Sequence, residues 1–369
     1  MFLKSLYLNN FRNYKNFSYK FENKKNIILG YNGSGKTSLL ESIYLLSFFK
    51  SFRAPDSYIP TYGSEFYFIK GEIINHINRI IELSYSIKER KKKVKKDSKE
   101  IKNFSIERGD FNVVLFLLSD LNLIDGTPEI KRDFMDDLFS QIDNEYSKLL
   151  YNYNRILESR NFVLKLDNNE KFKNLETLNE IIVKYGSEII FKRIQFLNEI
   201  NEIFIKILKD FNIKNLDDVK IEYKCNIFDD ILEDFNIEFI KTRYKNILEE
   251  NLKKEIAMEC TLFGPHRDNF IFKNKEGYDL KGVFSTGEKR IIATIFKFAQ
   301  FFFVKNKIND NPVILMDDAT IEIDKKNSLI LIDFINKLDA QFFITTSEMS
   351  FVSEINDKEI INLNEIIKN

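Results

Sequence analysis

The sequence predicts an α/β fold in which two α/β halves of one domain, residues 1–126 and 257–369, flank a mostly helical inserted lobe, residues 127–256. Three observations predict this fold. Apolar and polar side chains alternate with a period of two near both ends of the chain. A glycine-rich loop separates a short apolar run from a helix, and apolar residues recur at spacings of three and four in the middle. With 369 residues, 44% of them apolar, the chain is long enough for one large domain or two smaller ones.

The first half is predicted to begin with strands. Residues 2–21 alternate between apolar and polar side chains, and the apolar run 26–29 ends at the glycine-rich loop. Residues 38–49 have the apolar spacing of a helix. Residues 66–86 again resemble strands, and the basic run 88–96 that follows them is predicted to form the tip of a hairpin.

The inserted lobe is predicted to begin with Thr127 as a helix cap and Pro128 at the first helical position. Helical spacing then covers residues 129–165, 175–208 and 237–258. No heptad is sustained over many turns, so the pattern does not support a long coiled coil.

The second half returns to strand-like sequence at residues 261–280. A helix is expected at 286–305, a buried strand at 312–316, a helix at 325–338 and a strand at 341–345. Strands that alternate with helices indicate a parallel sheet.

Net charge, cysteine content and hydrophobicity limit the classes of protein to which this chain can belong. Lys plus Arg and Asp plus Glu are 56 each, so any nucleic-acid surface must be a local patch. The two cysteines, Cys225 and Cys260, have no partner motif and are expected to be reduced thiols. No secretory signal is found, and the most apolar stretch, residues 291–304, is too short to span a bilayer. We therefore expect a cytoplasmic protein.

The glycine-rich loop carries the most specific motif of the sequence. It reads Gly30-Tyr31-Asn32-Gly33-Ser34-Gly35-Lys36-Thr37, followed by Ser38, and fits the phosphate-binding pattern G-x-x-x-x-G-K-S/T. Glycines let backbone N–H groups face phosphate oxygens, and the following helix presents its positive end to them. Lys36 is predicted to reach the β- and γ-phosphates of ATP, and the Thr37 hydroxyl to ligate Mg²⁺. The alternative is a glycine-rich turn before a helix.

Two carboxylates, Asp317 and Asp318, follow the buried strand 312–316. In P-loop proteins a carboxylate at the end of such a strand lies beside the phosphate loop. Asp317 is predicted to hold Mg²⁺ through water, and Asp318 to polarise the attacking water as general base. The alternative is a strand that ends in an acidic turn.

Ser285, Gly287 and Glu288 stand at the start of the helix 286–305. Ser285 and Glu288 form a capping box, which by itself indicates only a helix start. Ser-x-Gly-Glu is also the signature motif of ATP-binding-cassette ATPases, where it contacts the γ-phosphate of ATP bound to the opposite subunit. The three motifs, in this order and with a long insertion, predict an ATP-binding-cassette-type ATPase head.

Five further segments carry a family resemblance over nearly the whole chain, weakest at residues 166–257. They are Leu8–Tyr14, Lys50–Arg53, residues 120–136 with Gly126, Pro128, Arg132, Phe134, Met135 and Asp136, residues 153–165, and Gly264–Asp268. The sequence resembles the RecF family of bacterial DNA replication and repair proteins, relatives of SMC ATPases.

The resemblance implies a two-lobed head that forms an ATP-dependent homodimer around two ATP molecules. It also implies binding to gapped or single-strand/duplex junction DNA, weak DNA-stimulated ATP hydrolysis, and loading of the RecA recombinase with the RecO and RecR mediators in repair and replication. By the same resemblance, Arg12 and Asn13 lie near the nucleotide, and Asp324 belongs to a cross-dimer loop.

Two departures from the family pattern are present, and one difference from transport cassettes is shared with the family. Leu118 replaces an expected proline, and the loop 321–324 begins with isoleucine instead of serine while retaining Asp324. Thr345 and Thr346 stand where transport cassettes carry a switch histidine, which the family also lacks. The absent histidine fits slow hydrolysis used for switching.

Other functions remain open. An SMC-like head would assemble protein complexes with little DNA contact. A transport ATPase subunit is disfavoured by the missing histidine and the insertion, and an ATPase-linked nuclease of the OLD type by the short sequence after Asp317. The run 88–96 is either a phosphate-contacting segment or a solvated loop. His266 is expected to be structural or to face DNA, and Arg267 to contact nucleotide or DNA.

Overall fold

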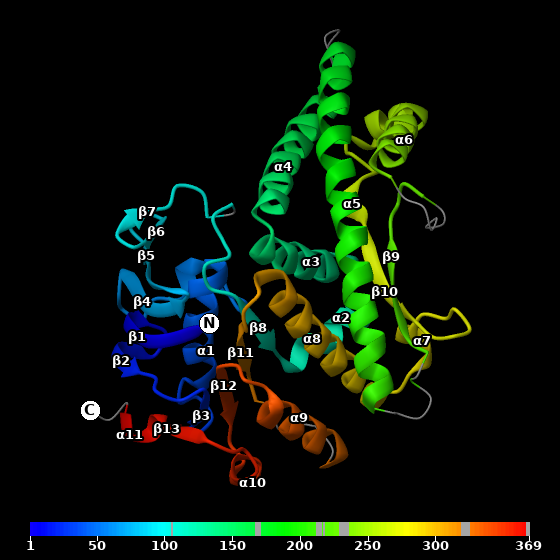
Figure 1. Cartoon of the computed structure of the whole chain (residues 1–369). Coiled ribbons are helices and arrows are strands. Elements are labelled where there is room, and N and C mark those ends of the chain that lie inside the picture. Colours follow the sequence, from blue (N-terminus) through cyan, green and yellow to red (C-terminus); the bar gives the residue numbers. More distant parts are fainter. Residues whose placement is uncertain are drawn as a thin grey trace. The chain divides into compact units, whose positions relative to one another are not determined.

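Two compact units make up the computed structural model, which describes residues 1–104, 106–166, 171–211, 216, 218–228, 236–318 and 325–366. The first unit is Met1–Asp120 with Gln300–Asn369, and the second is Leu121–Ala299 (Figure 1). Each unit is described by itself.

A five-stranded parallel sheet forms one layer of the first unit, in the order β13-β3-β12-β11-β8. Its strands are β3 (Lys25–Leu29), β8 (Val113–Phe116), β11 (Val313–Met316), β12 (Phe342–Thr346) and β13 (Lys358–Asn362). Every residue of β11 and β12 is buried, as expected for parallel strands covered on both faces. The carboxyl ends of β3, β12 and β11 therefore meet at one edge of this sheet.

A six-stranded antiparallel sheet forms the other layer, in the order β2-β1-β4-β5-β6-β7. Its strands are β1 (Phe2–Phe11), β2 (Tyr14–Lys20), β4 (Phe66–Asn75), β5 (Ile77–Ser86), β6 (Lys91–Lys96) and β7 (Lys99–Glu100). Leu6, Ile69 and Leu83 are buried on one face, whereas the alternating residues of these strands are partly or fully exposed. The sheet therefore has one core face and one solvent face.

The prediction that residues 88–96 form a hairpin tip is wrong for most of the run. Residues 91–96 form β6 itself, which pairs antiparallel with β5, and only the residues before Lys91 turn. The reason is Val94, which lies opposite Leu83 and is fully buried. Burial of this side chain fixes the strand although lysines surround it.

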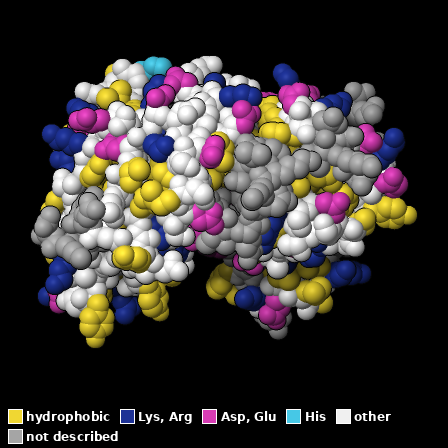
Figure 2. Space-filling model, turned by 90° about the horizontal axis from the view of Figure 1, so that it is seen from below, with side chains coloured by type: hydrophobic (Ala, Val, Ile, Leu, Met, Phe, Trp, Pro, Cys, Tyr) yellow, Lys and Arg dark blue, Asp and Glu magenta, His cyan; other side chains and the backbone are white. Residues whose placement is uncertain are grey.

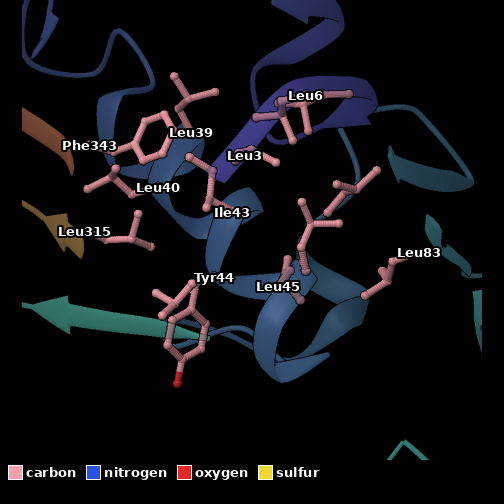
Figure 3. Close-up of a cluster of buried hydrophobic side chains, with 14 of the residues drawn as sticks. Leu3, Leu6, Leu39, Leu40, Ile43, Tyr44, Leu45, Leu83, Leu315 and Phe343 are labelled. Carbon is pink, nitrogen blue, oxygen red and sulfur yellow. The ribbon is translucent and has the colours of Figure 1, made fainter. Parts of the chain in front are cut away.

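Helix α1 (Lys36–Phe48) is the core of the first unit. Twelve of its residues, among them Leu39, Leu40 and Ile43, are classed as buried, so the helix is covered on all sides. Figure 3 shows these side chains among those of Leu315 and Phe343 of the parallel sheet and Leu3, Leu6 and Leu83 of the antiparallel sheet, all members of one apolar cluster. The other helices described in this unit are η1 (Asp56–Tyr58), α9 (Lys325–Lys337), α10 (Met349–Ser353) and α11 (Leu363–Ile366), and η2 (Leu118–Leu121) stands at its boundary in sequence.

The second unit is mostly helical. Its elements are α2 (Asn122–Asp125), α3 (Pro128–Ile142), α4 (Asn144–Leu164), α5 (Lys171–Phe211), β9 (Lys220–Lys224), α6 (Ile237–Met258), η3 (Pro265–Arg267), β10 (Asn269–Lys273) and α7 (Leu280–Val283). The single helix predicted at 129–165 is broken at Asp143, whose side chain accepts hydrogen bonds from the backbone N–H groups of Glu145 and Tyr146. Asp143 thus caps a new helix.

The compact units do not follow the sequence boundaries at 126 and 257. Residues 257–299 belong to the second unit because β10 pairs with β9 and because Phe270 and Phe272 pack against Phe296. Helix α8 (Thr286–Ile308) begins in the second unit and ends in the first. The assignment of 257–299 to the ATPase head stays a prediction.

In the part of the chain that the structure describes, no helix is long and apolar enough to cross a membrane.

A buried ion pair ties α4 to α6 in the second unit. The Arg160 guanidinium donates to Glu255 at 2.6 Å, and both side chains are 0% exposed. Arg160 also donates to the hydroxyl of Thr261 at 2.8 Å, and the second Glu255 oxygen accepts the backbone N–H of Leu262 at 2.8 Å. Each charge is thus surrounded by hydrogen-bonding groups that replace water.

We predict that Glu255→Ala lowers the free energy of unfolding by about 3–5 kcal/mol, because it leaves the Arg160 charge buried without its partner. The matched control is Glu249→Ala on the exposed side of the same helix, which should change it by less than about 0.5 kcal/mol. Urea denaturation followed by circular dichroism measures both. Equal effects of the two substitutions would contradict this assignment.

Candidate functional site

The glycine-rich loop connects β3 to α1, and its backbone needs two of its glycines. Gly33 and Gly35 have φ of 82° and 98°. A Cβ at Gly35 would also lie 2.6 Å from the side-chain amide nitrogen of Asn13. Gly30 is required for space, since a Cβ there would lie 2.2 Å from Ser34 Oγ. The loop therefore curls tightly against Asn13 and opens at the N-terminus of α1.

Lys36 is held over this loop. Its side chain is 6% exposed, and its ammonium group donates to the carbonyls of Gly30 at 2.9 Å and Tyr31 at 3.3 Å. The hydroxyl of Ser34 is buried, with no hydrogen-bond partner among the described residues. A positive charge, an unsatisfied hydroxyl and the N–H groups at the start of a 13-residue helix form an anion-binding site.

A cation site adjoins the loop at the carboxyl edge of the parallel sheet. Thr37 Oγ1 lies 3.0 Å from Asp317 Oδ1, which also accepts the Thr345 hydroxyl at 2.8 Å. Neighbouring ligands of an octahedral Mg²⁺ at about 2.1 Å are separated by roughly 3 Å, so this pair of oxygens fits the ion. Burial raises the pKa of Asp317, while hydrogen bonds from Thr345 and Thr37 oppose that rise. A bound cation would offset the cost of burying this charge.

Asp318 leaves the strand in a left-handed conformation with φ of 50°. Its backbone N–H donates to the Thr345 hydroxyl at 2.7 Å. Thr345, at the end of β12, thus fixes the carboxylate of Asp317 and the backbone of Asp318 together. In the sequence, Thr345 stands out only because it occupies the position of a histidine in transport cassettes.

A cavity of about 690 Å³ joins these groups. It is lined by Arg12, Asn13, Asn32, Gly33, Gly35, Lys36, Thr37, Ser38, Arg53, Thr61, Tyr62 and Asp318. This volume lies within the range of small-molecule sites, about 300–1,000 Å³. Nine of these residues were predicted from the sequence, whereas Arg53, Thr61 and Tyr62 were not predicted as site residues. Their loop precedes β4 and reaches the cavity only through tertiary structure.

A buried carboxylate holds two arginines at the cavity. Glu41, on α1, is 0% exposed and accepts two hydrogen bonds from Arg12, at 2.6 and 2.9 Å. The Arg53 guanidinium lies 3.6 Å from the same carboxylate, and Ser51 donates to it at 2.5 Å. Glu41 was not predicted as a site residue, although a single carboxylate within the apolar helical run 38–49 is a usable signal.

The Ser285 motif lies in the second unit. The capping box is confirmed, because Ser285 N–H donates to Glu288 at 2.9 Å and Glu288 N–H to the Ser285 hydroxyl at 3.3 Å. Ser285 and Gly287 are exposed, and a Cβ on Gly287 would meet nothing within 4 Å. The N-terminus of α8 is therefore open to a ligand or partner. Asp324 lies outside the described residues.

The segment Gly264–Asp268 is built around buried side chains. The ring of His266 contacts the Tyr153 hydroxyl at 2.7 Å and the Thr261 carbonyl oxygen at 3.1 Å. Burial, together with the nearby arginines, lowers the pKa of His266 to about 4, although the hydrogen bond with the Thr261 carbonyl opposes this shift. This histidine is neutral at pH 7 and holds the segment in place. Arg267 is exposed.

Comparison with known proteins identifies relatives over the full length of the chain. A family model described as the RecF/RecN/SMC N terminal domain matches residues 2–366. The chain is 32% identical over 371 residues to the DNA replication and repair protein RecF of Macrococcus caseolyticus (strain JCSC5402), covering 99% of this chain and 98% of that protein. It is 32% identical over 366 residues to that of Bacillus mycoides (strain KBAB4), covering 97% and 95%.

Solved structures agree with this relationship. The structure of the recombination mediator protein RecF-ATP in the RecFOR pathway matches with a TM-score of 0.87 at 27% identity, covering 98% of this chain and 97% of that one. A SmcHead bound to the C-winged helix domain of ScpA matches with a TM-score of 0.53 at 16% identity, which shows the fold alone. The predicted ATP-binding-cassette-type head fold is confirmed.

We predict that Lys36→Ala weakens Mg-ATP binding roughly 10- to 150-fold, the range expected when a charged hydrogen-bonding group is lost. Isothermal titration calorimetry measures the dissociation constant. Lys15→Ala, an exposed lysine of β2, is the control and should bind like the wild type. If Lys36→Ala weakened Mg-ATP binding less than twofold, the assignment of the loop to the ATP-binding site would be wrong.

We predict a pH-dependent contribution of His266 to stability. Its pKa is about 4 in the folded chain and 6.5 in the reference state, so between these values the unfolded chain binds a proton that the folded chain does not. Stability present above pH 6.5 is therefore lost as the pH falls, by about 2.5 kcal/mol at pH 4.5. Urea denaturation at pH 7 and 4.5 should show a smaller loss in His266→Gln. Equal losses in both proteins would contradict the neutral, structural histidine.

Proposed function

This chain belongs to the RecF family of ATP-binding-cassette-type ATPases, and on that premise we propose that it is an ATP-dependent DNA-binding protein of recombinational repair and replication. ATP and Mg²⁺ bind in the cavity at the phosphate loop, and ATP draws two copies together on gapped or single-strand/duplex junction DNA. The observation that carries the proposal is the meeting of Lys36, Thr37 and Asp317 at one edge of the parallel sheet.

Phosphate binding follows from the loop itself. When the nucleotide binds, Lys36 exchanges its two carbonyl partners for the β- and γ-phosphate oxygens. Backbone N–H groups at the start of α1 face the same oxygens. Arg12 and Arg53 add positive charge, and because Glu41 fixes them, little side-chain entropy is lost on binding.

Thr37 and Asp317 would hold Mg²⁺, Asp317 directly or through water. Mg²⁺ held by these residues would neutralise charge on the transferred phosphoryl group. Asp318 orients and deprotonates the water that attacks the γ-phosphate. Thr345 cannot act as the base, because its hydroxyl already donates to Asp317 and accepts from Asp318 N–H. Its role is to position both aspartates.

Dimerisation is proposed through the exposed start of α8. Ser285 and Gly287 of one copy would contact the γ-phosphate of ATP bound to the other copy, as in the signature motif of related cassettes. Glu288 supports the serine by the capping box. ATP would then bind the dimer more tightly than the monomer and so raise the fraction of dimer. Hydrolysis of ATP would lower that fraction again.

DNA is proposed as the ligand of the dimer because the curated relatives are named as DNA replication and repair proteins and a solved relative as a recombination mediator. RecO and RecR are proposed as protein partners, with RecA loading as the outcome. The zero net charge gives no support to DNA binding, and the alternative is an SMC-like head that assembles proteins with little DNA contact. On the face shown in Figure 2, basic and acidic side chains are interspersed, so a DNA surface must be local.

We predict that Asp318→Asn binds ATP normally but hydrolyses it roughly 10²- to 10⁴-fold more slowly, because the general base is lost. ATP should then hold this variant as a dimer on gapped duplex DNA, whereas Lys36→Arg, the matched variant at the loop, should bind DNA weakly with ATP. Phosphate-release assays and binding to labelled gapped DNA with and without ATP, at two salt concentrations, measure these effects. Tight ATP binding without DNA affinity at either salt would favour the protein-assembly head.

A further inference from the structure

The solvent face of the six-stranded sheet carries aromatic and basic side chains in an ordered arrangement. Tyr7 of β1 and Phe66 of β4 are 38% and 45% exposed, and Phe68 lies between them on the same face, partly exposed. The rings of Tyr7 and Phe68 lie 6.1 Å apart and are tilted by 59°, so they are not stacked on each other.

The lysines of β6 are divided between the two faces. Lys92 and Lys96 point toward the core side and are paired, Lys92 with Asp56 at 2.5 Å and Lys96 with Asp110. Lys91, Lys93 and Lys95 alternate with them and are exposed. On that side Lys93 lies 3.9 Å from Glu89, and this ion pair is weak because it is long and both side chains are exposed.

The sheet register aligns these lysines with the aromatic residues. Lys93 lies opposite Ser84, and Ser84 lies opposite Phe68. Lys91 is aligned in the same way through Ser86 with Phe66. One strand, β5, lies between each lysine and its aromatic residue, so two interstrand spacings of together about 10 Å separate them, and the intervening residue is a small serine.

Two acidic residues of this face lie beside lysines of β4 and β1. Glu82 lies 3.6 Å from Lys70, and Glu72 lies 3.1 Å from Lys4. Glu100 of β7 is exposed at the edge, opposite Lys95. Lys95 lies between Glu82 and Glu100 in the register, so Lys91 and Lys93 carry the positive charge that is aligned with the aromatic rings.

We propose that this face, defined by Tyr7, Phe66 and Phe68 with Lys91, Lys93 and Lys95, binds single-stranded DNA. Bases stack on exposed aromatic rings and phosphates contact the lysines, the combination used by single-strand-binding surfaces. Lysines two residues apart on a strand are spaced by about 6.8 Å, which suits successive phosphates of an extended single strand. Duplex DNA keeps its bases stacked inside and could not use the rings. The inference extends the proposed function, since it gives the single-stranded part of a gapped substrate a site of its own.

The site can be probed by fluorescence because the chain has no tryptophan. In Tyr7→Trp the introduced indole is the only one, and stacking of a thymine base should quench its emission when a 20-nucleotide oligo-dT is added. Tyr278→Trp, at a 63% exposed position of the second unit, is the control and should not be quenched. Equal emission changes in the two proteins would overturn the proposed site.

Two further variants separate stacking from charge. Tyr7→Leu should weaken binding of oligo-dT roughly 5- to 150-fold, yet leave binding of an abasic oligomer of equal length unchanged, because only bases stack. Lys91→Gln/Lys93→Gln/Lys95→Gln should weaken both ligands and reduce the salt slope of log K by about 2. Lys245→Gln/Lys253→Gln/Lys275→Gln, exposed lysines of the second unit, is the charge control. Thermal unfolding verifies that each variant folds.

The outcomes distinguish this inference from the proposed function. If the sheet variants bind oligo-dT like the wild type while ATP-dependent binding of gapped DNA persists, the inference fails and the proposed function stands. If the wild type binds neither DNA at any salt, both fail. If Tyr7→Leu changes the sedimentation of the protein but not DNA binding, the face is a protein interface and the inference is overturned.

Discussion

Burial of helix α1 on all sides is the constraint on which the rest of the first unit depends. The helix packs against the parallel sheet through Leu315 and Phe343 and against the antiparallel sheet through Leu3 and Leu6. A helix held on every side cannot shift along its axis without disrupting a close-packed core. Its N-terminus is therefore fixed relative to the ends of the parallel strands, and the phosphate loop and Asp317 keep their spacing.

Helix α1 also places one charged residue of the candidate nucleotide site, Glu41, in the core. Glu41 lies one turn after Thr37 and is 0% exposed, a position that would be costly for an unpaired carboxylate. Arg12 and Arg53 supply the compensating charge, and both line the cavity. The core thus fixes two cationic side chains in the lining of the cavity. Stability of α1 and organisation of the binding site are consequently coupled.

Strand β6 places alternate residues of one short basic run on the core side and on the solvent face of the sheet. Val94, Lys92 and Lys96 face the core side, where the lysine ammonium groups meet carboxylates and carbonyls at its margin. The alternating lysines face solvent beside exposed aromatic residues of β1 and β4. A strand period of two separates the structural and the exposed charges completely, so net charge in sequence says little about either face.

The sequence by itself determined the phosphate loop, the order of the motifs, the long helices and the buried strand before Asp317, because each depends on local spacing or on a fixed pattern of residue types. Short elements such as β8 and β13 were not predicted, since four or five residues without clear alternation take their structure from sheet partners. The strand nature of residues 91–96 depended on Val94 meeting Leu83, and the break at Asp143 on a cap within a continuous helical pattern. Only the tertiary structure decided that Thr345, Glu41 and Arg53 join the site, because parallel pairing and the packing of α1 bring together residues far apart in sequence.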